Sequence, residues 1–173
     1  SYDIVNISDL LVGTLCVQLV ATFPIAAYFY FFFFSMDDGT AFLALINFLL
    51  ISAIWLTMVF ISSLKYYSVI TFSFITGMGL AVLLAYVLSG YAGAIGLLLG
   101  FNIGMALILS SFIAVIFAEY PHLVQHPFMF LKYLKKYWMV ALFGTCYNVG
   151  IWVDKWIMWF SPERRQLPNG MII

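Results

Sequence analysis

Residues 66–118 read YYSVITFSFITGMGLAVLLAYVLSGYAGAIGLLLGFNIGMALILSSFIAVIFA and contain no charged side chain. A helix that crosses the hydrocarbon core of a bilayer needs about 20 predominantly apolar residues, so this stretch is long enough for two crossings. Helices satisfy their own backbone hydrogen bonds in lipid, whereas strands of membrane barrels show polar–apolar alternation, which is absent here. The stretch therefore predicts two transmembrane helices that are joined at residues 90–93.

The composition of the whole chain extends this prediction. Of its 173 residues, 65 % are hydrophobic and only 8 % are charged, which excludes an ordinary soluble domain. The formal net charge is zero, so no overall field favours nucleic acid, and we predict no nucleic-acid partner. Cys16 and Cys146 both lie in apolar stretches, which indicates buried thiols rather than a disulfide framework or a metal cluster.

Hydropathy divides the chain into five spans, so the predicted fold is all-α: a polytopic membrane bundle of about five transmembrane helices. The first span is longer than the ~30 Å hydrocarbon core and is expected to tilt or to kink at Pro24. The chain starts without a methionine and stops as a new apolar stretch begins, which suggests an internal piece of a larger membrane protein. The five predicted spans are residues 10–35, 41–64, 67–89, 94–118 and 137–160.

Basic residues in the short connections predict the orientation, because cytoplasmic loops carry the excess of lysine and arginine. Four lie on one side, which we place in the cytoplasm, and two on the other: Lys65, Lys132, Lys135 and Lys136 against Arg164 and Arg165. The Asp37–Asp38 turn then lies outside. Lys132, Lys135 and Lys136 stand among aromatic and apolar residues in a short basic amphipathic stretch, so they are expected to lie along the anionic inner membrane surface.

The last span has two different faces when its residues are placed at 100° per step. Trp138 and Trp156 would be separated by roughly 27 Å of helix, which is typical of a lipid-facing side with an aromatic belt at each end. The polar face should therefore look into protein or water. The polar face carries Gly144, Tyr147, Asn148, Ile151, Asp154, Lys155 and Met158, and the opposite face carries Trp138, Leu142, Val149, Trp152, Val153 and Trp156.

Asp154 and Lys155 are the charged pair of this span. A charge at the centre of a membrane-inserted helix costs about +2.5 to +3.5 kcal/mol, and adjacent residues on a helix do not face each other. We therefore predict a role for Asp154, Lys155, Asn148 and Tyr147 in a substrate pathway or a contact between lobes. The alternative is that both charges lie near the outer headgroups, where the stem of Lys155 lets its ammonium reach water.

Small and amide side chains indicate how the helices pack. Gly96, Gly100 and Gly104 follow a four-residue spacing, which lets another helix approach closely, within the chain or in a dimer. Gln18, Asn47, Asn102 and Asn148 are expected to hydrogen-bond across helices at about 0.6 kcal/mol each. The aromatic run at residues 28–34 is typical of an interfacial belt, and stacking on sugar rings is the alternative.

Catalytic and cofactor motifs are missing from the sequence. It has no phosphate loop, no nucleophile elbow and no pair of carboxylates within a span, so we predict that the protein is not an enzyme and needs no cofactor. His122 and His126 have a spacing that suits a metal, but no third ligand stands close to them in sequence, so we predict no metal site.

The sequence NVGIWVDKWIMWFSP at residues 148–162 resembles the hallmark of the Pel exopolysaccharide transporter family (PelG-like). This family belongs to the superfamily of polysaccharide, multidrug and lipid-linked-oligosaccharide flippases. Ser8 and Asp9 are similar to the cytoplasmic end that precedes the family's third helix. The resemblance implies a larger two-lobed transporter, with four helices of the N-terminal lobe at 1–118, a cytoplasmic inter-lobe connection at 119–136, and the first helix of the C-terminal lobe with the start of an external loop at 137–173.

The resemblance also implies a function and partners. It implies export of an amino-sugar-rich exopolysaccharide across the bacterial inner membrane for the biofilm matrix, together with a glycosyltransferase and membrane partners. The bilayer and the polysaccharide are then the other expected partners. Two alternatives stay open: a multidrug or lipid-linked-oligosaccharide flippase of the same fold, and a non-transporting scaffold subunit of a membrane-bound polysaccharide synthase.

Overall fold

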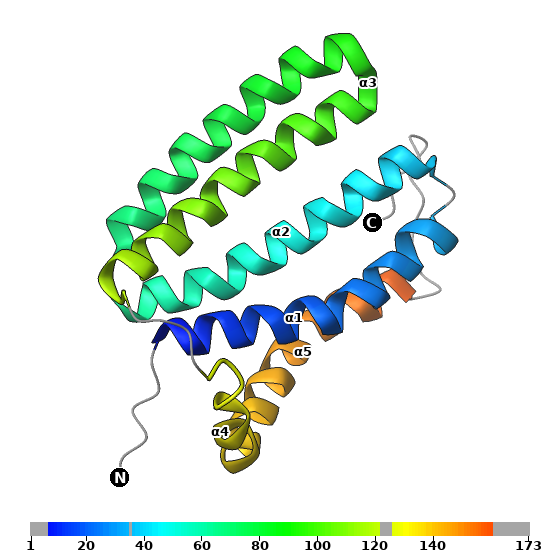
Figure 1. The fold of residues 1–173 in the computed structure, drawn as a ribbon. Helices are drawn as coiled ribbons and strands as arrows, with labels where there is room; N and C mark the ends of the chain where they lie inside the picture. Colours follow the sequence, from blue (N-terminus) through cyan, green and yellow to red (C-terminus); the bar gives the residue numbers. More distant parts are fainter. Residues whose placement is uncertain (1–6, 35, 122–125, 161–173) are drawn as a thin grey trace. The chain divides into compact units, whose positions relative to one another are not determined.

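The computed structural model describes residues 7–34, 36–121 and 126–160, apart from the side chains of residues 133, 134, 141, 148, 154, 156, 159 and 160. Within these residues all regular structure is helical and no strand occurs, which confirms the predicted all-α class. The helices are α1 (Ile7–Tyr28), the π-helical η1 (Phe29–Phe33), α2 (Asp38–Ser63), α3 (Tyr67–Glu119), α4 (Phe130–Lys136) and α5 (Trp138–Phe160) (Figure 1).

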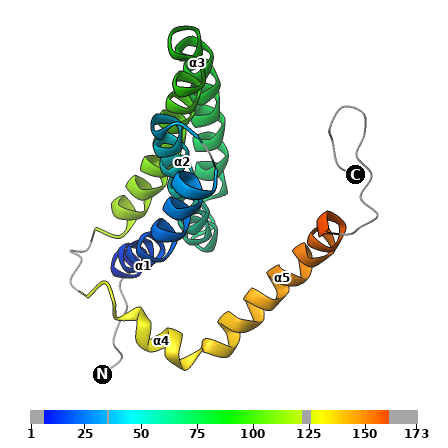
Figure 2. The same ribbon diagram turned by 90° about the vertical axis from the view of Figure 1, so that its right-hand side faces the viewer.

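The chain forms two compact units, Ser1–Phe130 and Leu131–Ile173. The boundary between them falls inside the predicted connection at residues 119–136. The first unit contains α1, η1, α2 and α3, and the second contains α5 with most of α4 (Figure 2). Each unit is therefore described separately below.

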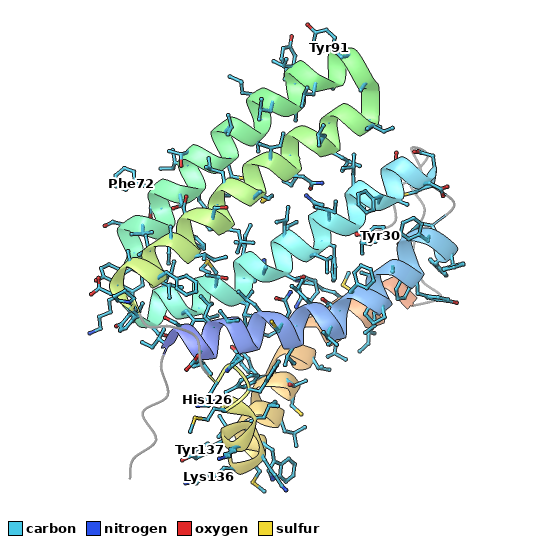
Figure 3. All side chains as sticks on the ribbon, in the orientation of Figure 1. Tyr30, Phe72, Tyr91, His126, Lys136 and Tyr137 are labelled. Atoms are coloured by element: carbon cyan, nitrogen blue, oxygen red, sulfur yellow. The ribbon has the colours of Figure 1, made fainter. Side chains whose placement is uncertain are left out.

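Helix α3 is a hairpin of two antiparallel arms (Figure 1). Helical geometry is interrupted at Ala92 and Gly93, and Gly93 has φ 56° and ψ −130°, a conformation that glycine reaches without steric cost. The arms, residues 67–91 and 94–119, correspond to the third and fourth predicted spans. Tyr91 lies at the tip of the hairpin, where its side chain is 88 % exposed (Figure 3).

The buried interior of the first unit comes from all three of its long helices. Phe112, Ile108 and Ile116 of α3 lie with Leu11 of α1 and Ile61 of α2 in one cluster of fully buried side chains. The Phe74 and Phe112 rings meet edge to face at 5.9 Å between centroids. Lipid tails are as apolar as these side chains, so close van der Waals packing rather than expulsion of water holds such a cluster together in a membrane.

Two polar turns bring consecutive helices back on themselves. Asp37 caps α2, and its carboxylate accepts a 2.9 Å hydrogen bond from the Thr40 amide. The hydrogen bonds from Thr40 hold the pKa of Asp37 below its usual value. At the other end of α2, Lys65 takes φ 63°, and the Tyr66 and Lys65 amides donate to the Ile61 and Ser62 carbonyls, which forms a Schellman-type end.

Three helices in the described residues are long and apolar enough to cross a membrane: Ile7–Phe33, Asp38–Ser63 and the double-length Tyr67–Glu119. In α5 a shorter apolar stretch, Trp138–Val153, falls below that length. The first helix continues past Pro24 as an α-helix to Tyr28 and then becomes π-helical at η1. The change from α-helical to π-helical hydrogen bonding therefore begins at Phe29, beyond Pro24.

Candidate functional site

The residues that the sequence marks as a candidate site lie on α5, in the second unit. Tyr147 is 69 % exposed and Lys155 is also exposed. The side chains of Asp154, Asn148 and Trp156 are outside the described part of the structure, so their roles remain predictions. Of the tryptophans expected as interfacial anchors, Trp138 and Trp152 are both exposed.

Lys155 reaches back along α5 to an aromatic ring. Its Nζ lies 4.2 Å from the centroid of the Trp152 ring, which is within the range of a cation–π interaction. The helical wheel places these two residues on different faces of α5, and the contact shows that the Lys155 side chain reaches from one face towards the other. Residues three apart are neighbours on a helix surface, and a lysine stem is long enough to cross the remaining distance.

The basic stretch that precedes α5 is exposed. Lys132, Lys135 and Lys136 are all accessible, and the last two occupy the last turn of α4, where a positive charge is favoured by the helix dipole. The Nζ of Lys136 lies 5.3 Å from the centroid of the Tyr137 ring (Figure 3). A lysine beside an aromatic ring has the chemistry of a membrane interface, where one end of each side chain is apolar and the other is polar.

The three spaced glycines lie between the two arms of α3, where all three are buried. A methyl group at Gly104 would overlap Ala81 Cβ and the Gly77 carbonyl, and one at Gly100 would overlap the backbone of Ala85. A methyl group at Gly96 would overlap the Leu88 carbonyl. The glycines therefore let the backbones of the two arms touch, which is the close approach expected within the chain.

An amide pair joins α2 to the second arm of α3. Asn47 Nδ2 donates to Asn102 Oδ1 at 2.8 Å, and Asn102 Nδ2 donates to the Leu43 carbonyl at 2.9 Å. Asn102 is only 6 % exposed, so these bonds meet the needs of an amide that has little access to water. Gln18 differs: both polar atoms of its side chain are buried and have no hydrogen-bond partner among the described residues.

One end of the first unit carries a cluster of polar contacts around the start of α1. Ser8 Oγ donates to the Tyr120 carbonyl at 2.7 Å, and the His126 amide donates to Asp9 Oδ1 at 3.3 Å. A methyl group on Gly13 would overlap the carbonyl of Pro127, so the two backbones are in close contact. The segment that follows α3 is therefore held against α1 at three points, which we call the α1 anchor: Ser8, Asp9 and Gly13.

A fourth contact closes the same end of the unit. The Tyr66 hydroxyl donates to the Glu119 carboxylate, and this hydrogen bond, together with the carboxylate's negative charge, raises the pKa of Tyr66. Tyr66 precedes the first arm of α3 and Glu119 ends the second, so the bond joins the two open ends of the hairpin.

No local pattern in the sequence predicts this polar end. Its partners are more than 100 residues apart for Ser8–Tyr120 and Asp9–His126, and all three hydrogen bonds use a backbone group or a tyrosine hydroxyl. Of the two histidines with metal-compatible spacing, His126 uses its backbone amide here, and His122 lies outside the described residues. No group of three or more potential metal-ligating side chains gathers in the part of the chain that the structure describes.

An apolar cavity of about 350 Å³ lies between α1 and α2 near this end. Its lining includes Ile7 and Leu10 from α1 and Phe60 and Ser63 from α2. The Ser63 hydroxyl already donates to the Val59 carbonyl within its own helix at 2.9 Å. This cavity offers an apolar surface and no group of polar side chains that would orient a sugar.

Long apolar helices, glycine-mediated contacts and polar ends define an α-helical membrane protein. The chain belongs to the PelG family, whose model is described as "Putative exopolysaccharide Exporter (EPS-E)" and matches residues 3–173. The description of the family names an exporter. A search of curated proteins and a search of solved structures each found no match to the chain.

Proposed function

We propose that the protein exports a Pel-type, amino-sugar-rich exopolysaccharide across the bacterial inner membrane, where the polymer contributes to the biofilm matrix. The observation that carries this proposal is the match to the exporter family over residues 3–173. The long apolar helices agree with it, because a polymer exporter must provide a protein-lined path through the bilayer.

The proposed orientation places the α1 anchor and the basic stretch of α4 in the cytoplasm. The count of basic residues supports this orientation, since four lysines fall in connections on one side of the predicted spans, Lys65, Lys132, Lys135 and Lys136, and two arginines fall on the other. A cytoplasmic glycosyltransferase would supply the growing polymer, and other membrane proteins of the secretion system would accompany the exporter. The polar face of α5, with Asp154 and Lys155, is proposed to line the path of the polymer or to contact another lobe.

A deletion of the gene in a polymer-producing bacterium tests the proposal. We expect surface polymer to disappear while polymer or its lipid-linked precursor accumulates inside the cell, because synthesis continues when the exit is missing. Restoring the gene on a plasmid should restore surface polymer. Both pools are measured by a polymer-specific lectin, on intact cells and after lysis.

The same measurement separates export from the scaffold alternative. If the protein only supported a synthase, its loss would stop synthesis, and neither the surface pool nor the internal pool would form. An unchanged surface pool in the deletion strain would reject both functions.

A further inference from the structure

Tyr120, His126 and Pro127, which lie between α3 and α4, contact the start of α1, and both hydrogen bonds among these contacts are partly buried. Ser8 is fully buried and Asp9 is 6 % exposed, although both are polar. A buried hydroxyl or carboxyl group is costly unless it is hydrogen-bonded, and here Ser8 bonds to the Tyr120 carbonyl and Asp9 accepts from the His126 amide. Contacts of this kind hold a segment in place, unlike exposed polar contacts that exchange readily with water.

Gly13 adds a contact that depends on shape rather than on charge. Its Cα faces the backbone of Pro127, and a methyl group there would also come within 2.9 Å of the Phe130 ring. The α1 anchor therefore contacts four residues of the following segment: Tyr120 through Ser8, His126 through Asp9, and Pro127 and Phe130 through Gly13. Phe130 is also the last residue of the first unit.

We propose that Ser8, Asp9 and Gly13 are positioning residues that fix the segment ending at Phe130 to the first unit, and so set the point at which the chain leaves that unit. Movements between the helical units of a transporter occur at a few residues that absorb the change in backbone angles. With the anchor in place, those residues are confined to the chain after Phe130. A second part of the proposal, which rests on the proposed function, is that export requires this anchor.

Hydrogen–deuterium exchange of the whole protein in lipid nanodiscs tests the anchor without any assay of export. In the unaltered protein, peptides that cover residues 120–130 should exchange slowly at the His126 amide. Asp9→Ala removes the acceptor, so this amide should exchange about tenfold faster. Asp9→Asn retains a carbonyl oxygen as acceptor, so it should keep much of the protection.

A pair of glycine variants tests the same anchor through shape. Gly13→Ala places a methyl group against Pro127 and should also speed exchange in residues 120–130. Gly79→Ala is the matched control, because a methyl group there meets no atom within 4 Å. Asp38→Ala is the control for loss of an acid, since Asp38 is exposed in the first turn of α2. If exchange of residues 120–130 is unchanged in both Asp9→Ala and Gly13→Ala, the proposal that these residues hold the segment is wrong.

Export by the same variants in cells tests the second part. We expect surface polymer to fall roughly tenfold in Asp9→Ala and Gly13→Ala, to recover in Asp9→Asn, and to stay normal in both controls, with equal amounts of protein in the membrane. Faster exchange with normal export would reject the role in export and leave the anchor standing. If cells that lack the gene export as much polymer as cells that carry it, the proposed function is rejected. The hydrogen–deuterium exchange result would still show whether the α1 anchor holds residues 120–130.

Discussion

Gly104→Leu is expected to prevent the two arms of α3 from packing, and so to remove most of the folded protein from the membrane. The new side chain would have to occupy space held by Ala81 Cβ and the Gly77 carbonyl. Backbone atoms cannot rotate away as the end of a flexible side chain can, so the arms must separate. Overpacking of a tight interior typically costs about 1–3 kcal/mol and occasionally more, and the backbone contact places this variant at the upper end.

The control for this variant is Gly79→Leu on the first arm of the same hairpin. A Cβ at Gly79 meets no atom within 4 Å and the residue is exposed, and both variants gain the same helix propensity from replacing glycine. We expect Gly79→Leu to keep a normal elution profile in size-exclusion chromatography of detergent extracts. Gly104→Leu should yield little folded protein, or show a melting temperature lower by roughly 5 to 10 °C. Equal melting temperatures would show that the arms do not depend on this close approach.

Asp154→Asn is expected to lower polymer export roughly tenfold while the amount of folded protein stays near normal. The substitution keeps the size of the side chain and removes its charge. The helical wheel predicts that Asp154 lies on the polar face of α5, and a carboxylate that faces the path would attract a cationic, amino-sugar-rich polymer. Surface polymer and membrane-extracted protein are measured in the same cultures, so that transport and folding are scored separately.

Lys155→Gln is the companion variant, and the two together distinguish three roles. The Lys155 ammonium lies over the Trp152 ring, an interaction worth about 0.5–1 kcal/mol at an exposed site. If Asp154 and a base form a structural pair, Asp154→Asn should reduce folded protein, because the base is left unpaired. If both variants show normal export and normal abundance, neither residue acts in transport or in a structural pair. Both would then be anchors at the outer membrane surface.

The apolar spans could be predicted because composition alone dictates them. A long run without charge, interrupted at Gly90 and Gly93, specifies a hairpin of helices, and α3 has that form with its turn at Ala92 and Gly93. The spacing of Gly96, Gly100 and Gly104 likewise indicated a close helix contact. These signals are local in sequence, and the physics behind them acts over one or two helical turns.

The hydrogen-bond partners of the polar side chains could not be predicted, because they depend on which segments that are distant in sequence meet in the fold. Nothing in the sequence distinguishes Asn47, which bonds to Asn102, from Gln18, whose amide has no partner among the described residues. The anchor at Ser8 and Asp9 depends on backbone groups of residues 120 and 126, which carry no sequence signal at all. The contact of Lys155 with Trp152 was missed because a two-face division ignores how far a lysine stem reaches.

Passage of the polymer across the bilayer is the central claim, and inside-out membrane vesicles measure it directly. Vesicles from polymer-producing cells receive radiolabelled sugar nucleotides, and a glycoside hydrolase that degrades the polymer is then added outside. With the protein present, labelled polymer should move into the lumen and resist the enzyme. Vesicles from the deletion strain should make polymer that the enzyme degrades completely. Equal protection of the polymer with and without the protein would contradict its assignment as the exporter.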